Sequence, residues 1–413
     1  MRCTPVGVGG VSGGGMRELW DGLLPIGRDP VSGGYRRHGW DAAELECRAW
    51  FRSAAADRDL AVEEDRDGNL WAWWGRPGPG AVVTGSHLDS VPDGGAYDGP
   101  LGVVSALAAV DLLRARGVEP RRPFAVAVFA EEEGSRFGIA CLGSRLLTGQ
   151  LDAGRARALV DRDGVTLERA LTEAGADPAA IGPDEERVRR LGCFVELHVE
   201  QGRALVDLAA PVGVGSAIWP HGRWRFDFAG VADHAGTTRL ADRRDPMLTF
   251  ANTVLSARKK ARLAGMVATI GRVEVTPNGT NAIPSLVRAW LDARAPDAST
   301  LADVVAAIEK AALERGERDG VDVTMTQESS TPETSFDAGL VGRVTGLLGG
   351  VPVLPTGAGH DAGVLATAGV PTVMLFVRNP TGVSHSPAEH AEWADCEAGA
   401  EALATVLEDL VTR

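Results

Sequence analysis

Two apolar runs separated by a helix-like stretch constrain the fold of this chain more than any other feature. The first run lies at 81–83, the stretch rich in small and apolar residues at 101–116, and the second run, PFAVAVFA, at 123–130. A run that is apolar on both faces is typical of a strand buried in a parallel sheet. Parallel neighbours need a crossover connection, which the middle stretch provides as a helix. The sequence therefore predicts an α/β protein with a mostly parallel sheet.

Side chains that can bind metal ions follow the ends of these strands. His87 and Asp89 come just after the first run, Asp98 lies in the glycine-rich loop beyond it, and three glutamates at 131–133 follow the second run. In open α/β sheets, ligand sites gather outside the carboxyl ends of the strands. Three adjacent carboxylates are costly to bury unless cations neutralise them, although a solvated charged turn is the alternative interpretation.

Two further histidines occupy similar places. Alternation in CFVELHVEQG, residues 193–202, puts His198 on a polar face, and His385 follows the apolar run at 372–377. With the residues above, they give a mixed nitrogen and oxygen set suited to Zn²⁺ or Mn²⁺. Five ligands exceed one tetrahedral site, so we expect two ions about 3.5 to 4 Å apart with a bridging carboxylate from Asp98. The expected ligands are His87, Asp98, Glu133, His198 and His385.

Two neighbouring carboxylates complete the expected chemistry. Glu132 adjoins the ligand Glu133 but is not itself needed as a ligand. It can therefore take a proton from water and later donate it to a leaving nitrogen. Asp89, two residues after His87, can accept a hydrogen bond from the other imidazole nitrogen and fix the orientation of the ring.

The chain changes character near residue 212, which predicts an inserted second domain. Strand-like and helix-like runs alternate there as in a βαββαβ unit with helices on one sheet face, an α+β arrangement. We interpret the segment SSTPETS, 329–335, as the return linker. We expect a discontinuous catalytic domain at 16–211 and 329–413 around an inserted domain at 212–328. The glycine-rich residues 1–15 are expected to be a disordered leader, with Met16 as an alternative start.

Composition argues against several classes of function. The net charge of −14, without a basic stripe, argues against binding to nucleic acid. No apolar stretch is long enough for a membrane span. The five cysteines are scattered without CxxC spacing, which indicates neither a disulfide framework nor a cysteine metal site and favours the cytoplasm. We also expect a small-molecule substrate, and neither nucleic acid nor a membrane as a partner.

The motifs and their order resemble one known family. GSHLDSV, with Asp98 eleven residues after His87, is followed by EEEGSRFG, HVEQG, DHAGTT, NAIP with DAR, GAGHDA and SHSPAE. This series is similar to the M20-type metallo-amidohydrolases, and within them to the branch of N-carbamoyl-L-amino-acid hydrolases and allantoate amidohydrolases. The resemblance covers nearly the whole chain from about residue 25.

The resemblance implies ligand sets and residue roles. It implies one ion held by His87, Asp98 and His198, a second held by Asp98, Glu133 and His385, and Glu132 as the base. It also implies that the inserted domain is a lid that forms a homodimer. His234 would stabilise the oxyanion, in its own site or the partner's. The implied substrate contacts are Asn281 and Arg294 to the α-carboxylate, and Gln201, Gly359 and His360 to the amide end.

Three departures from the family pattern add cationic groups. They are Arg239 after AGTT, Arg378 with Asn379 before SHSPAE, and the segment Trp219-Pro220-His221. Each can be an exposed substitution. Together they suggest the hypothesis that the substrate carries a second carboxylate, as an N-carbamoyl or N-formyl derivative of glutamate or aspartate would.

The expected reaction is hydrolysis of the ureido or carbamoyl C–N bond of N-carbamoyl-L-amino acids or allantoate, with release of ammonia. Deacylation of an N-acyl acidic amino acid such as N-formyl-L-glutamate is the alternative within the same metal chemistry. A non-catalytic dimeric binding protein is the alternative of another class. The intact Glu132 and the full set of candidate ligands argue against this last alternative.

Overall fold

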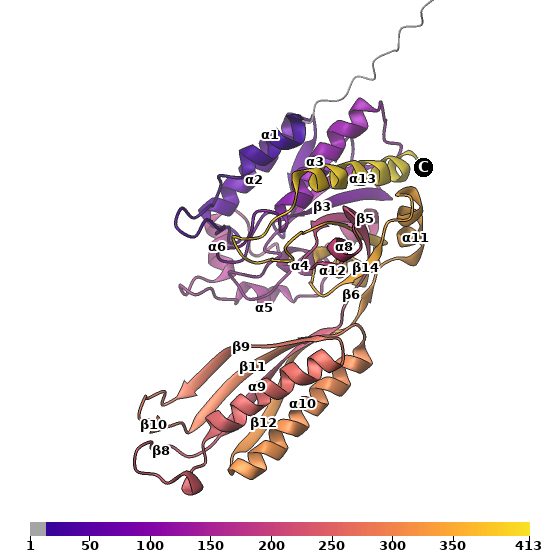
Figure 1. The fold of residues 1–413 in the computed structure, drawn as a ribbon. Coiled ribbons are helices and arrows are strands. Elements are labelled where there is room, and N and C mark those ends of the chain that lie inside the picture. Colours follow the sequence, from indigo (N-terminus) through magenta and orange to yellow (C-terminus); the bar gives the residue numbers. More distant parts are fainter. Residues whose placement is uncertain (1–13) are drawn as a thin grey trace, which may run out of the picture. The chain divides into compact units, whose positions relative to one another are not determined.

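The structure is a computed structural model that describes residues 14–413 and divides into two compact units (Figure 1). Unit 1 runs to Ser216 and resumes at Ser335, and unit 2 comprises Ala217–Thr334. These boundaries lie a few residues beyond the expected ones at 211 and 328. The reason at the first boundary is that the strand expected to open the inserted domain pairs with a strand of unit 1 instead.

A nine-stranded sheet forms the centre of unit 1, in the order β1-β2-β4-β3-β5-β15-β6-β13, with β14 paired to β6. Its four central strands are parallel and almost wholly buried, as the apolar runs predict. They are β4 (Phe124–Phe129), β3 (Ala81–His87), β5 (Leu191–Val199) and β15 (Thr372–Val377). The outer strands are β1 (Ala61–Glu64), β2 (Leu70–Trp74), β6 (Val212–Ile218), β13 (Thr334–Ser335) and β14 (Val353–Thr356).

Helices lie on both faces of this sheet (Figure 1). On one face, α3 (Pro100–Ala115) packs against α13 (Trp393–Thr412), and α1 (Gly14–Leu23), α2 (Ala42–Ala56) and α11 (Ala338–Leu347) join the same core. Residues Val195 and Leu197 of β5 face this core, so Glu196 and His198 point to the opposite face, as alternation predicts. The other helices are α4 (Leu142–Leu147), α5 (Ala153–Arg157), α6 (Leu167–Glu173), α7 (Glu185–Arg190), α8 (Ala204–Asp207) and α12 (Asp361–Thr367).

Unit 2 is an antiparallel four-stranded sheet with two helices packed on one face. The strand order is β12-β7-β11-β9, and α9 (Pro246–Leu263) and α10 (Ala298–Asp319) make this a βαββαβ unit. The strands are β7 (His221–Ala229), β9 (Val267–Thr276), β11 (Leu286–Arg294) and β12 (Asp322–Thr331), with a short ladder of β8 (Asp233–His234) and β10 (Ala282–Ile283) and the turn η1 (Leu240–Asp242). The expected fold class, a mostly parallel α/β domain with an inserted α+β unit, is confirmed.

Two segments differ from expectation. The expected linker at 329–335 is mostly strand, because Ser329–Thr331 continue the pairing of β12 with β7 and β13 follows at Thr334. Gly14 and Gly15 of the expected leader already belong to α1, and residues 1–13 lie outside the described part of the chain. Among the described residues, no helix is both long and apolar enough to cross a membrane.

The sequence Asp-Arg-Asp-Gly occurs twice, at 65–68 and 161–164, and forms the same turn in both places. The first carboxylate accepts the N–H of the second aspartate at 3.0 Å in each turn, from Asp67 to Asp65 and from Asp163 to Asp161. Asp163 is exposed, whereas Asp67 is 1 % exposed and its Oδ2 has no hydrogen-bond partner among the described residues. Burial, and then the charge of Asp65, raise the pKa of Asp67 to about 8.

Replacing Asp67 with asparagine should make the stability of the protein less dependent on pH. Because the pKa of Asp67 is higher in the folded than in the unfolded chain, the contribution of Asp67 to stability falls as pH rises from about 4 to 8. The asparagine side chain keeps an oxygen for the N–H of Gly182, which lies 2.7 Å from Asp67 Oδ1, but cannot ionise. The fall in unfolding free energy between pH 6 and pH 8, measured by urea denaturation, should therefore be smaller by about 2 kcal/mol in Asp67→Asn.

Asp163→Asn is the matched control, since it changes the exposed copy of the same turn. It should leave the pH dependence unchanged. If the urea midpoint of Asp67→Asn changed with pH by as much as that of the wild type, this would contradict the role of Asp67.

Candidate metal centre

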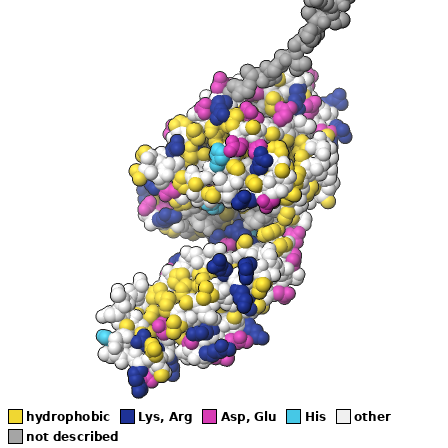
Figure 2. Space-filling view, in the orientation of Figure 1, with side chains coloured by type: hydrophobic (Ala, Val, Ile, Leu, Met, Phe, Trp, Pro, Cys, Tyr) yellow, Lys and Arg dark blue, Asp and Glu magenta, His cyan; other side chains and the backbone are white. Residues whose placement is uncertain are grey.

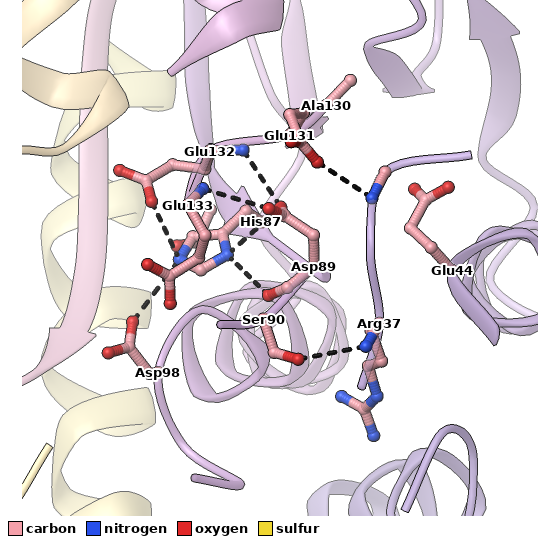
Figure 3. A network of polar contacts seen from close by, with 12 residues as sticks. Arg37, Glu44, His87, Asp89, Ser90, Asp98, Ala130, Glu131, Glu132 and Glu133 are labelled. Carbon is pink, nitrogen blue, oxygen red and sulfur yellow. Dashed lines mark hydrogen bonds and ion pairs between the residues drawn. The ribbon is translucent and has the colours of Figure 1, made fainter. Parts of the chain in front are cut away.

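The carboxyl ends of the parallel strands bring the expected ligands together. His87 is the last residue of β3, His198 lies near the end of β5, Glu133 follows β4 and His385 follows β15. Asp98 lies in the loop just before α3. Figure 3 shows Asp98, Glu132 and Glu133 lying around the ring of His87.

The two oxygens of Asp98 face two groups of ligands. Oδ1 lies 3.2 Å from His198 Nε2 and 3.5 Å from His87 Nε2. Oδ2 lies 3.4 Å from His385 Nε2, and Glu133 Oε2 is also 3.4 Å from that nitrogen. In each group, the candidate ligand atoms all lie within 4.8 Å of one another. These are the two sets that the family resemblance implies, and Asp98 is the residue that they share.

The buried histidines are oriented as metal ligands. The Nε2 atoms of His87 and His198 are buried and make no hydrogen bond of good geometry with any described residue. Their Nδ1 atoms are held by main-chain oxygens, at 3.1 Å from Asp89 O and 2.9 Å from Val199 O. A ligand histidine usually donates its other N–H to such an acceptor. The orphaned nitrogens and the mixed donor set therefore fit a divalent cation such as Zn²⁺ or Mn²⁺.

Burial makes charge expensive in this cluster. It raises the pKa of Glu133 to about 7 and that of Glu132 well above its usual range. Burial also opposes the charged forms of Asp98 and His87. The neighbouring histidines, His198 first, nevertheless hold the pKa of Asp98 well below its usual value, and the carboxylates, Glu132 first, hold the pKa of His87 well above. A bound divalent cation would supply the positive charge that these carboxylates need.

Asp89 lies beside the His87 ring, as expected, and also contacts the backbone of the glutamates. His87 Nδ1 donates to the main-chain oxygen of Asp89, whereas the nearest carboxylate oxygen of Asp89 lies 3.5 Å away. The carboxylate also accepts the N–H groups of Glu132 at 3.1 Å and Glu133 at 3.0 Å (Figure 3). Asp89 therefore lies where it can orient the imidazole, and it also fixes the backbone of the candidate base and of a candidate ligand.

Glu132 remains outside both ligand groups. Its Oε1 accepts a hydrogen bond from Cys141 Sγ at 3.3 Å, and its Oε2 lies 3.7 Å from His87 Nε2. A buried carboxylate beside the ligands, but not among them, is free to exchange a proton.

The candidate substrate residues of unit 1 differ in their burial and in their contacts with the ligand groups. Gln201 Nε2 donates to Asp98 Oδ2 at 2.7 Å, so its amide contacts the shared carboxylate. His360 is buried with its Nε2 unpaired among the described residues, its ring centroid lies 4.5 Å from that of His198, and burial holds its pKa well below the usual range. Gly359 is exposed, and a Cβ placed there would have no other atom within 4 Å.

In unit 2, His234 and Asn281 lie together but Arg294 does not. The motifs DHAGTT and NAIP meet in the β8–β10 ladder, where Ala235 N donates to Asn281 O at 3.0 Å. Arg294 is the last residue of β11, and Asn281 precedes its first residue. The strand alone spans about 26 Å from the rise per residue. Asn281 and Arg294 of one chain therefore lie at opposite ends of this sheet.

Two of the extra cationic groups, Arg378 and Arg239, form ion pairs with aspartates, whereas His221 Nδ1 lies 3.2 Å from the main-chain oxygen of Trp219. Arg378 donates from Nε and Nη2 to Asp395 at 2.8 and 3.0 Å, and Arg239 donates to Asp242 at 2.7 Å. Asn379 binds its own loop instead, donating to Val383 O at 2.8 Å. The charge of Arg378 is therefore balanced by a buried aspartate, whereas the side chain of Arg239 is 81% exposed and stays accessible to a ligand.

Two buried carboxylates that support the site were not predicted. Glu131 accepts the N–H groups of Gly39, Arg136 and Phe137 at 2.8 to 3.0 Å. Glu389 accepts the N–H groups of Tyr97 and Asp98. Both belong to the motifs EEEGSRFG and SHSPAE, so motif membership was the available signal.

Divalent cations should raise the melting temperature of the protein, because they bind the folded chain only. At a free ion concentration of 100 times Kd, the gain in unfolding free energy is about 2.7 kcal/mol per ion. His198→Ala should lose much of this increase in differential scanning fluorimetry with Zn²⁺ or Mn²⁺. His390→Ala, which changes an exposed histidine outside the ligand groups, is the control. An undiminished increase in His198→Ala would contradict the ligand assignment.

Known proteins are similar to this chain over most of its length. The family model described as Peptidase family M20/M25/M40 matches residues 83–409. An N-carbamoyl-L-amino acid amidohydrolase of Geobacillus stearothermophilus is 38% identical, over 88% of this chain and 90% of its own. The allantoate amidohydrolase of Escherichia coli is 33% identical, over 89% and 90% of the two chains.

A crystal structure is similar over the whole fold. It is that of an amidase of the hydantoinase/carbamoylase family from Burkholderia multivorans, with a TM-score of 0.85 and 30% identity over 96% of this chain and 98% of that one. The family model and these relatives each cover most of the chain, and the chain therefore belongs to the peptidase M20/M25/M40 family.

Proposed function

We propose that the protein is a two-metal amidohydrolase that cleaves the ureido or carbamoyl C–N bond of an N-carbamoyl-L-amino acid or of allantoate and releases ammonia. The observation that carries the proposal is the shared carboxylate of Asp98 between two ligand groups, beside the uncoordinated Glu132. The activities named for relatives at 33–38% identity support the same bond as the target.

The residues of the chain suit the proton transfers of this reaction. When bound, two divalent cations would supply Lewis-acid activation of water and of the scissile carbonyl. Glu132 takes a proton from the attacking water, while Cys141 keeps one of its oxygens in place. The carboxyl group of Glu132 can then donate this proton to the leaving nitrogen. A carbamoyl substrate then yields the amino acid, carbon dioxide and ammonia.

The roles of the substrate residues stay proposals. In unit 1, the unpaired Nε2 of His360 supports contact with the amide end of the substrate, and Gln201 and Gly359 are proposed beside it. In unit 2, we propose His234 for the oxyanion and Asn281 and Arg294 for the α-carboxylate, from their motifs. Asn281 and Arg294 lie at opposite ends of β11, too far apart for one small substrate to reach both within one chain. If both contact the same substrate molecule, they come from two copies of the chain.

We propose a homodimer formed through unit 2. The exposed side of α9 carries Leu248, Leu255 and Leu263, and the edge strand β9 carries exposed Val267 and Val273. The face of unit 2 seen in Figure 2 shows hydrophobic side chains grouped among basic ones. An unpaired strand edge and an apolar helix face are typical of a surface that another chain covers.

Leu255→Glu should convert the dimer into a monomer in size-exclusion chromatography with light scattering, because a charge would be buried without a partner. Leu208→Glu changes a leucine of similar exposure in unit 1, 53% against 66%, and should leave the dimer intact. A monomeric wild type, or a dimeric Leu255→Glu protein, would contradict this interface.

We also propose the cytoplasm as the compartment. The cysteines at positions 47, 141, 193 and 396 are buried and free, which supports a reducing environment.

The substrate class is tested by turnover on N-carbamoyl-L-amino acids, allantoate and N-formyl-L-glutamate, with ammonia and free amine both measured. Ammonia from the carbamoyl substrates or from allantoate is the expected result. Free amine from the formyl substrate without ammonia would contradict the proposal and indicate a deacylase.

Glu132→Gln should lower kcat by at least about 10²-fold, the usual contribution of a general base, and should retain bound metal. A metal analysis on the same sample is the control. Turnover like that of the wild type would show that another group moves the proton.

A further inference from the structure

We propose that Glu389 is a positioning residue that joins the two ligand groups into one site, because it holds the loop of Asp98 against the loop of Ser384 and His385. The inference rests on the two-ion site proposed above.

Glu389 binds both loops through its two carboxylate oxygens. Oε1 accepts the main-chain N–H of Tyr97 at 2.7 Å and that of Asp98 at 3.0 Å. Oε2 lies 3.4 Å from Ser384 Oγ, and that hydroxyl lies 3.0 Å from Asp98 Oδ2. Glu389 therefore binds the backbone of Asp98, which lies 291 residues away in the sequence. It also lies near the Ser384 hydroxyl that contacts the Asp98 carboxylate.

The fit between Glu389 and the Asp98 loop is close. Glu389 is 5% exposed, and a Cβ placed on Gly95 would lie 2.4 Å from its Cβ and from its Oε1. Only a residue without a side chain fits there, since real Cβ contacts do not come that close. Among residues 14–413, Glu389 forms no ion pair with lysine or arginine. Its charge is satisfied chiefly by the N–H groups of the loop that it holds.

The group containing His385 depends on this contact more than the group containing His87. His87 and His198 lie on buried strands and are held by the sheet. The His385 side chain is 50% exposed. His385 lies in the loop after β15, where its backbone has a φ of 54°, in the left-handed region. Exposed loop ligands hold their geometry only through neighbouring contacts. Losing Glu389 should therefore release the ion of Asp98, Glu133 and His385 before the ion of the buried group.

Two substitutions of Glu389 separate its role as an acceptor from its charge. Glu389→Gln keeps an oxygen that can accept both N–H groups, whereas Glu389→Leu keeps the approximate size and removes the acceptor. Glu392→Gln neutralises an exposed carboxylate three residues away and serves as the control. Gly95→Ala is an independent variant, because it pushes the Asp98 loop away from Glu389 and leaves every carboxylate unchanged.

The experiment measures bound Zn²⁺ or Mn²⁺ per chain by plasma mass spectrometry after dialysis, and the affinity for the second ion by competition with a chromophoric chelator. We expect two ions on the wild type, Glu389→Gln and Glu392→Gln. We expect one tightly bound ion on Glu389→Leu and Gly95→Ala, with the second ion bound about 10- to 100-fold more weakly, the usual effect of losing a residue that orients a ligand. Circular dichroism checks that the variants are folded, and Gly95→Ala decides the test if Glu389→Leu is not.

Two ions with wild-type affinity on folded Glu389→Leu, or on Gly95→Ala, would overturn the inference. The inference would also be overturned if Glu389→Gln lost as much affinity for the second ion as Glu389→Leu. That result would show that the effect depends on the charge of Glu389 and not on its role as an acceptor. Fewer than two ions on the wild type would instead overturn the two-ion site itself, which separates the failure of the proposed function from the failure of the role of Glu389.

Discussion

The division of the Asp98 carboxylate between two ligand groups is the constraint on which the rest of the site depends. One oxygen of Asp98 lies near His87 and His198, which belong to strands of the sheet. The other lies near His385, which is also close to Glu133. A single shared carboxylate can serve two cations only if its position is fixed within a few tenths of an ångström. The parallel sheet supplies the buried histidines, but Asp98 itself lies in a loop, so its position has to come from contacts beyond the sheet.

Buried carboxylates that accept main-chain N–H groups supply those contacts. Asp89 holds the backbone of Glu132 and Glu133, Glu131 holds the turn that follows them, and Glu389 holds Asp98. A buried carboxylate without a cation is costly, and burial raises the pKa of Glu131 to about 8. Several N–H donors on one charged acceptor offset part of this cost and fix the loop at the same time. Main-chain hydrogen bonds to these carboxylates therefore help to fix the loops that carry the site.

The sequence predicts the fold and the five candidate ligands because both follow from local patterns. Apolar runs identify the buried strands, alternation places His198 on the face away from the α3 core, and strand ends collect the polar residues. The contacts of the loops do not follow from such patterns. Asp89 offers a carbonyl and a carboxylate two residues after His87, and only coordinates show which one the imidazole meets. Contacts between residues distant in the sequence could not be predicted either. Arg378 binds Asp395, and Glu389 binds the backbone of Asp98, only because the folded chain brings these segments together.

The most direct test of the shared Asp98 site is anomalous diffraction at the metal absorption edge, from crystals grown with Zn²⁺ or Mn²⁺. We expect two peaks, one beside each oxygen of Asp98, with His87 and His198 at the first and Glu133 and His385 at the second. A single peak, or two peaks that do not share Asp98, would contradict the division of this carboxylate between two ions.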